Sequence, residues 1–203
     1  MNIINEILEP NNFYHLYNRG INGCEIYNNE ENYLFFLNKF SKYLIEYVDV
    51  YAYCLMPNHF HFVIKIKEFQ TGNFVKVPNF DKVENEKGLH SKDLIISKQI
   101  GKFISSYSQA FNKVNQRSGS LLESPFKRKK INSEDYLKNV ILYVHLNSEA
   151  LGISYSNNKF SSYLGIVSNL KTNIAREECI SLFNDLENFK YSHKFPPKLD
   201  FNF

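Results

Sequence analysis

Two histidines separated by one phenylalanine, His59 and His61, lie in the apolar stretch "CLMPNHFHFVIK". Residues two apart in a β-strand share a face, so both imidazoles point to the same side of a strand predicted over 59–66. The other side of that strand is purely apolar, with Phe60, Phe62, Ile64 and Ile66. Two neighbouring imidazoles can hold one metal ion, bind one phosphate or transfer protons. The pair alone does not choose among these roles, and ordinary hydrogen bonding by both rings stays open as an alternative.

A second group of candidate residues follows in "SEDYLKNVILYVHLNSEALG", which runs from Ser133 to Gly152. Its apolar residues recur at helical spacing and predict a buried stripe, with Ser133 as the cap. The stripe consists of Leu137, Val140, Ile141 and Val144. Tyr136, Tyr143 and Asn147 fall on one flank of it, and the last two are one turn apart and therefore neighbours. A phenol beside a carboxamide could act as nucleophile and metal ligand, although packing explains most tyrosines at such positions.

The elements that must position these residues form a recognisable order. The predicted elements are a strand over 13–18, a helix over about 30–47, strands over 49–56 and 59–66, a helix ending near 114, a strand over 126–131 and the helix from Ser133. This order predicts an α+β fold, a ferredoxin-like βαββαβ sandwich with an added C-terminal helix. The domain that carries the candidate residues is expected over 1–150, interrupted by a polar loop insertion over about 67–96. Residues 151–203 are expected to form an accessory segment with one helix near 175–187.

Composition limits the setting and the partners. The chain has 203 residues and a net charge of +3, which fits a nucleic-acid partner without requiring one. It has no apolar run near the roughly 20 residues of a membrane helix and no signal-peptide pattern at its N-terminus, so a cytoplasmic protein is expected. The odd number of cysteines, without a CxxC pair, argues against a disulfide framework or a cysteine zinc site. The cysteines are Cys24, Cys54 and Cys179.

The strongest local charge cluster is "FKRKKI". It contains Lys127, Arg128, Lys129 and Lys130. Such a run is expected to be a solvated edge strand, a contact for the DNA backbone, or both. Arg19 and His15, on the first predicted strand, are further candidates to lie near the two histidines.

The motifs together resemble the HUH-type single-tyrosine transposases, in particular the REP-associated tyrosine transposases. The resemblance rests on "YAYCLMPNHFHFVIK" and "YLKNVILYVHLNSEALG", supported by "FYHLYNRGINGCEIYNNEENYLFFL", "QAFNKVNQRSGSLLESPFK" and "SSYLG", and it covers roughly residues 13–165. It implies that His59, His61 and Asn147 bind a divalent metal, Mg²⁺ or Mn²⁺, and that Tyr143 is the nucleophile. The chain departs from the family pattern at Ser148, where a proline is usual, and at Pro125, where a basic residue is common.

The resemblance further implies cleavage of single-stranded or hairpin DNA through a 5′-phosphotyrosine intermediate. Tyr136 is the rival nucleophile, but it lies roughly 16 Å from Asn147 along the helix axis, whereas Tyr143 lies one turn away. Two alternatives remain open at this point. One is a DNA-binding protein of the same fold without cleavage, and the other is a metal-dependent phosphodiesterase that uses water. The sequence is compatible with a monomer and with a homodimer.

Overall fold

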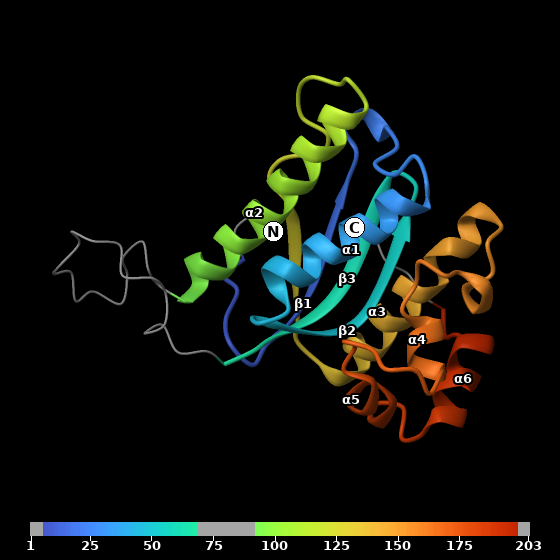
Figure 1. Ribbon diagram of the computed structural model, residues 1–203. Coiled ribbons are helices and arrows are strands. Elements are labelled where there is room, and N and C mark those ends of the chain that lie inside the picture. The colour runs from blue at the N-terminus through green and yellow to red at the C-terminus, as the bar shows by residue number, and fades with distance from the viewer. Residues whose placement is uncertain (1–5, 69–91, 199–203) are drawn as a thin grey trace, which may run out of the picture.

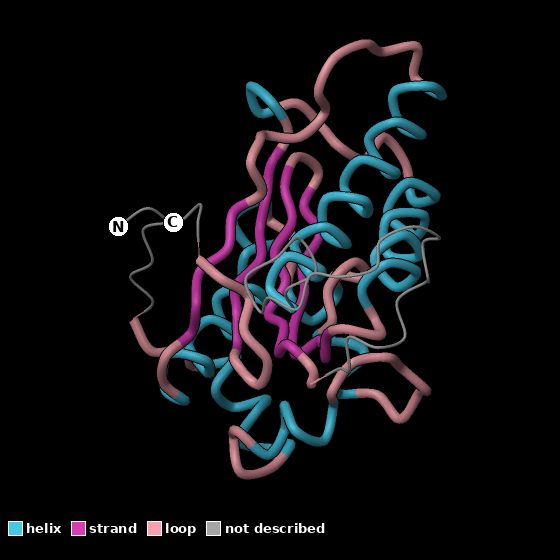
Figure 2. The backbone as a smooth tube through the Cα atoms, turned by 90° about the vertical axis from the view of Figure 1, so that its left-hand side faces the viewer, coloured by secondary structure: helices cyan, strands magenta, loops and turns pink. Residues whose placement is uncertain are grey.

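The computed structural model describes residues 6–68 and 92–198 (Figure 1). At its centre is an antiparallel sheet of four strands, which Figure 2 shows side by side. The strands are β1 (Phe13–Arg19), β2 (Val48–Met56), β3 (His59–Ile66) and β4 (Lys127–Ile131). Their order is β2-β3-β1-β4, so β1 and β2 run parallel with β3 between them. This is the split βαβ arrangement that the sequence predicted, and the ferredoxin-like fold is confirmed.

Two helices, α1 (Glu30–Leu44) and α2 (Lys92–Val114), cover one face of the sheet (Figure 1). The helix α1 begins where the side chain of Asn29 accepts a hydrogen bond from the backbone N–H of Asn32. The predicted apolar face of β3 packs here, and the rings of Phe40 and Phe62 stack with centroids 4.2 Å apart. The helix ends at Leu44, three residues before the predicted end. Tyr47 closes a turn onto the carbonyl of Leu44 directly before β2 begins.

The helix α3 (Glu134–Leu146) packs on the opposite face of the sheet. Its cap is confirmed, because the Ser133 hydroxyl accepts from the N–H of Tyr136. All four residues of the predicted stripe are buried. The α-helix stops at Leu146 and continues as a 3₁₀ helix over Asn147–Leu151, which is a correction to the single helix expected up to Gly152. Asn147 keeps right-handed helical dihedral angles, so its side chain still follows the last turn of α3.

The C-terminal part is a set of short helices beside α3 and β2 (Figure 1). They are η5 (Tyr155–Asn157), α4 (Tyr163–Val167), α5 (Arg176–Ser181) and α6 (Leu186–Lys194). The single helix predicted near 175–187 is therefore wrong. The chain breaks at Asn184, whose φ is 73°, and Asp185 then caps a new helix by accepting from the N–H of Asn188 at 2.7 Å.

This C-terminal part also satisfies the outer edge of β2, which the sheet leaves unpaired. The backbone N–H of Tyr53 donates to the hydroxyl of Ser162 at 2.8 Å. The backbone N–H of Ala175 donates to the carbonyl of Val50 at 2.9 Å. An edge covered in this way is not available for pairing with another chain.

A buried chain of hydrogen bonds joins α3 to α6. His193 Nδ1 donates to the carbonyl of Phe189, so its Nε2 accepts from His145 Nδ1 at 2.8 Å. His145 Nε2 then accepts from the hydroxyl of Ser162 at 2.7 Å. Both rings are neutral in this arrangement, and burial lowers the pKa of His193 to about 4 and that of His145 well below its usual value. These hydrogen bonds link the two helices. Protonation of either ring would occupy a nitrogen lone pair that now accepts a hydrogen bond, and so would break one link.

The predicted loop insertion over about 67–96 falls mostly on residues 69–91, which lie outside the described residues. Its last part is corrected, because residues 92–96 already belong to α2. Within residues 6–68 and 92–198, no helix is long and apolar enough to span a membrane.

Candidate metal and nucleophile site

The two histidines of β3 lie at its first and third positions, directly after the turn at Pro57 and Asn58. Their side chains lie on the sheet face that α3 covers, and the ring centroids are 5.2 Å apart. His61 is buried, whereas His59 is only partly buried and lies at the end of the strand opposite Arg19. The predicted common face of the two imidazoles is confirmed.

The protonation of His59 follows from its two hydrogen-bonding neighbours. Asn58 directs its amide nitrogen to the carbonyl of Gly23 and its Oδ1 to His59 Nδ1, 2.6 Å away. The Nδ1 atom therefore carries the proton, and the lone pair of Nε2 faces the Oδ1 atom of Asn147 at 3.0 Å. Burial lowers the pKa of His59, the contact with Asn147 raises it, and the charge of Arg19 lowers it, with a net decrease. Two acceptors thus face each other, and a cation between them would satisfy both.

His61 is linked to the first strand. Its Nδ1 lies 2.8 Å from Nε2 of His15, which is 1% exposed. Burial is the main cause that lowers the pKa of His61 well below its usual value and that of His15 to about 3. Both rings are therefore neutral at physiological pH, and Nε2 of His61 is left available to a ligand. His15 is brought to the site, as its place on the first strand suggested.

Tyr143 lies on α3 above these rings. Its ring meets those of His61 and His15 edge-on, with centroids 5.6 and 6.3 Å apart. Burial raises the pKa of Tyr143, and a hydrogen bond from Asn147 opposes this by lowering it. An amide N–H donated to a phenol oxygen stabilises the phenolate. Asn147 therefore turns its oxygen toward His59 and its nitrogen toward the nucleophile that the sequence predicted.

The donor set fits a divalent metal. The two imidazole nitrogens are borderline ligands, and the amide oxygen is a hard ligand. Such a set suits Mn²⁺ or Mg²⁺, whereas thiolate ligands would favour softer metals. The 3.0 Å separation between His59 Nε2 and Asn147 Oδ1 equals that of two adjacent ligands at about 2.1 Å around an octahedral ion. In the described part of the chain, no group of three or more His, Cys, Asp or Glu side chains is placed to hold a metal. A metal held by His59 and His61 would therefore need a third ligand of another kind, and the amide oxygen of Asn147 is in place to be that ligand.

Tyr136, the rival nucleophile, occupies the first turn of α3 and is far from Asn147 along the helix. The ammonium of Lys129 lies over its ring, 5.5 Å from the centroid. Burial raises the pKa of Tyr17 on β1, and the neighbouring phenols of Tyr143 and Tyr136 raise it further. The structure therefore places Tyr136 on the same flank as Tyr143 but at the opposite end from the His59–Asn147 contact.

The basic run of β4 is divided between the two faces of the sheet, because successive strand residues alternate. Lys127 and Lys129 lie opposite Tyr17 and His15, on the face of the candidate site. Arg128 hydrogen-bonds to the carbonyl of Glu6 on the other face. Lys130 likewise binds the N-terminal segment, through an ion pair with Glu9 at 2.5 Å.

Arg19 and Glu123 form a charged pair at the open end of the site. Arg19 Nε lies 2.5 Å from the Glu123 carboxylate, which also contacts Lys127 at 3.1 Å. These two cations hold the pKa of Glu123 below its usual value. Sequence analysis missed Glu123 as a neighbour of the site, and it also missed Asn58. Only the position of Asn58 beside His59 offered a signal, since nothing local connects Glu123 to the histidines.

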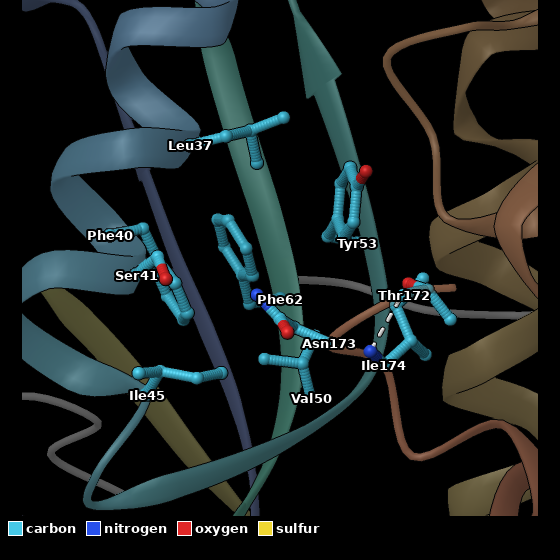
Figure 3. A pocket seen from close by; sticks show the side chains of 10 residues that line it. All are labelled: Leu37, Phe40, Ser41, Ile45, Val50, Tyr53, Phe62, Thr172, Asn173 and Ile174. Carbon is cyan, nitrogen blue, oxygen red and sulfur yellow. Dashed lines mark hydrogen bonds between the residues drawn. The ribbon is translucent and has the colours of Figure 1, made fainter. Parts of the chain in front are cut away.

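A separate small cavity of about 190 Å³ lies on the α1 side of the sheet (Figure 3). It is bounded by α1, the outer part of β2 and the segment 172–174. Phe62, which lines it, points away from the face that carries His59 and His61. This cavity is therefore not part of the candidate site.

The comparisons with known proteins concern the fold of the chain. One solved structure, a REP-associated tyrosine transposase bound to a REP hairpin, superimposes with a TM-score of 0.55 over 85% of this chain and 90% of that one. The two chains share a fold. Their sequence identity is 14%, so the likeness shows the fold alone. No protein-family model matches the chain, and no curated protein sequence matches it.

Proposed function

We propose that this protein is a DNA strand transferase that cleaves single-stranded or hairpin DNA through Tyr143. The observation that carries the proposal is that Asn147 contacts both His59 and Tyr143, while the ring of Tyr143 meets that of His61 edge-on. The shared fold with a hairpin-bound tyrosine transposase supports a DNA substrate of this kind. All these residues lie within residues 1–150, so we assign catalysis to that part and an accessory role to 151–203.

In this proposal, His59, His61 and Asn147 hold a divalent metal, Mg²⁺ or Mn²⁺. When bound, the ion would supply positive charge to a phosphate oxygen and so stabilise the transition state. Asn147 orients the Tyr143 oxygen beside it, and its N–H favours the phenolate that burial disfavours. Asn58 and His15 orient the two imidazoles through their Nδ1 atoms, and burial keeps both rings neutral.

The reaction is balanced without an external energy source. The Tyr143 oxygen attacks the phosphorus and loses its proton, while the bond from phosphorus to the 3′ oxygen of the neighbouring nucleotide breaks. That oxygen leaves as a 3′-OH, and the DNA remains attached as a 5′-phosphotyrosine. Attack on this ester by a second 3′-OH reverses the chemistry and joins two strands.

Tyrosine substitutions test the proposal most directly. Labelled hairpin DNA with single-stranded flanks is incubated with Mn²⁺ and run on a denaturing gel. The wild-type protein should form a covalent adduct that is lost in Tyr143→Phe and in His59→Ala but kept in the matched Tyr136→Phe variant. Cleavage without an adduct that survives Tyr143→Phe would instead assign the site to a phosphodiesterase that uses water. Binding without cleavage or adduct would assign the protein to the non-cleaving class.

A further inference from the structure

The helix α2 and the segment after it carry a concentrated positive charge. Between Leu94 and Leu122 the sequence holds four basic residues and no acidic one, which exceeds the net charge of +3 of the whole chain. The four are Lys98, Lys102, Lys113 and Arg117. All four are exposed. Within residues 6–68 and 92–198, Lys102, Lys113 and Arg117 form no ion pair with an acid.

The exposed side of α2 is bordered by two shallow grooves. One, of about 360 Å³, lies between α2 and residues 119–126. The other, of about 690 Å³, lies on the side of Tyr43 of α1. Their α2 walls are mostly small polar side chains, namely Ser105, Ser106, Ser108, Gln109 and Asn112. Gly101 lies in both grooves, and the space beside it is open.

This surface suits phosphates better than bases. Hydroxyl and amide groups with flanking cations are the usual contacts to the DNA backbone. Single-strand sites also need aromatic rings on which bases stack. The aromatic rings of α2 in the described residues face the core instead. They are Phe103, Tyr107 and Phe111. From outside α2, one aromatic ring lines each groove, Tyr43 in one and Phe126 in the other. A single ring per groove does not form a stacking surface for successive bases, so the chemistry favours a double-helical segment.

The groove beside residues 119–126 leads to the candidate site. The backbone N–H of Glu123, which lines this groove, donates to the carbonyl of Arg19 at 2.9 Å, and its side chain pairs with the same residue. Arg19 lies opposite His59 in the sheet. The C-terminal end of α2 and the start of β3 lie at the same end of the molecule (Figure 1). A duplex held along α2 could thus extend a single-stranded flank toward Tyr143.

We propose that the exposed face of α2 binds the phosphate backbone of the duplex stem of hairpin DNA and directs its single-stranded flank into the site. This inference rests on the proposed function for the role of the flank. The binding surface itself is separable from catalysis, because its cations Lys102, Lys113 and Arg117 lie outside the site, which the surface meets at Glu123.

The test measures binding and chemistry separately. The double variant Lys102→Gln/Lys113→Gln is compared with a matched control, Lys171→Gln/Lys194→Gln, whose lysines are also exposed but lie away from α2. Binding to a flank-free stem–loop is followed by fluorescence anisotropy over a series of salt concentrations. Each lost phosphate contact should reduce the slope of log affinity against log salt by about 0.9. The α2 variant should therefore lose about two units of slope and more than tenfold in affinity at about 0.1 M salt, and the control should not.

Adduct formation on a short unstructured oligonucleotide is measured in the same proteins. It should be equal in wild type and both double variants, since the site is intact in all of them. Equal stem affinity and slope in the α2 variant and the control would overturn the inference. So would a wild-type protein that forms adducts on single strands but does not bind the stem, and this outcome would leave the proposed function standing. Stem binding that depends on α2 without any adduct would support the surface and refute the chemistry.

Discussion

The hydrogen bond between His15 and His61 gives the sharpest test of how the site is built. For His61 to bind a metal through Nε2, its Nδ1 must carry the proton and donate to Nε2 of His15 at 2.8 Å. Replacing His15 with leucine removes the acceptor and leaves the His61 N–H buried without it. Replacing it with glutamine keeps an acceptor oxygen near the position of Nε2.

The expected magnitude follows from the burial of the pair. Loss of a hydrogen bond that orients a metal-binding histidine typically costs 10–100-fold in metal affinity, or about 1.4–2.8 kcal/mol. His15 is 1% exposed, so water cannot replace it without reorganisation. Leaving a donor unsatisfied there should also reduce the free energy of unfolding by about 1–3 kcal/mol. We expect His15→Leu to bind Mn²⁺ roughly 10–100 times more weakly and His15→Gln to stay within about threefold of wild type.

Mn²⁺ affinity is measured by titration without DNA, using the electron paramagnetic resonance signal of the free ion. Unfolding in urea is followed in parallel, so that the affinity is compared only between folded proteins. His193→Gln serves as the matched control, because it alters a buried histidine pair on the other side of α3. The reasoning is refuted if folded His15→Leu binds Mn²⁺ as tightly as wild type, since His15 would then only fill the core.

Three further predictions concern protons and charges around the site. The pKa of His193 is about 4 in the folded chain and about 6.5 in the unfolded one, so its contribution to stability is complete above pH 6.5 and is lost as the pH falls. Between pH 7.5 and pH 5, the free energy of unfolding in urea should fall by about 2 kcal/mol more in wild type than in His193→Gln. Asn147→Ala should weaken Mn²⁺ binding and raise the pKa of Tyr143 further. Adduct formation, measured with excess Mn²⁺, should therefore shift to higher pH. An unchanged pH profile would argue against the hydrogen bond from Asn147 to Tyr143. Glu123→Gln should change stability by less than about 1 kcal/mol, as exposed ion pairs do. Because it leaves Arg19 without a carboxylate neighbour, it should also tighten DNA binding and steepen its salt dependence in anisotropy measurements, and weaker binding would contradict this.

The order of the elements could be predicted because the patterns that define them are local. Alternation in β3 places His59 and His61 on one face, and helical spacing in α3 places Tyr143 near Asn147. His145 lies on the other side of α3 and faces α6. Its partner could not be predicted, because His193 comes from a helix whose packing depends on the whole fold.

The basic run of β4 shows a second limit of local patterns. Treated as one cluster, its four residues suggest a single DNA contact. The strand turns Arg128 and Lys130 to the face where they bind the N-terminal segment. Lys127 and Lys129 remain on the face of the site. Whether a basic side chain of β4 can contact DNA depends on partners that are distant in sequence, such as Glu9. The spacing of residues along the chain does not reveal such partners.

The position of two imidazoles in the most apolar strand has a physical explanation. Burial disfavours the imidazolium, so His59 and His61 stay neutral below the pH at which exposed histidines become charged. Burying an imidazole costs free energy unless its N–H group is hydrogen-bonded. Asn58 accepts the hydrogen bond from His59, and His15 accepts that from His61. The remaining nitrogens are then lone-pair donors with fixed directions, held by a strand whose other face is packed under α1 and α2. Apolar surroundings therefore keep both imidazoles neutral, and the hydrogen bonds to Asn58 and His15 hold them in the orientation that the proposed metal site requires.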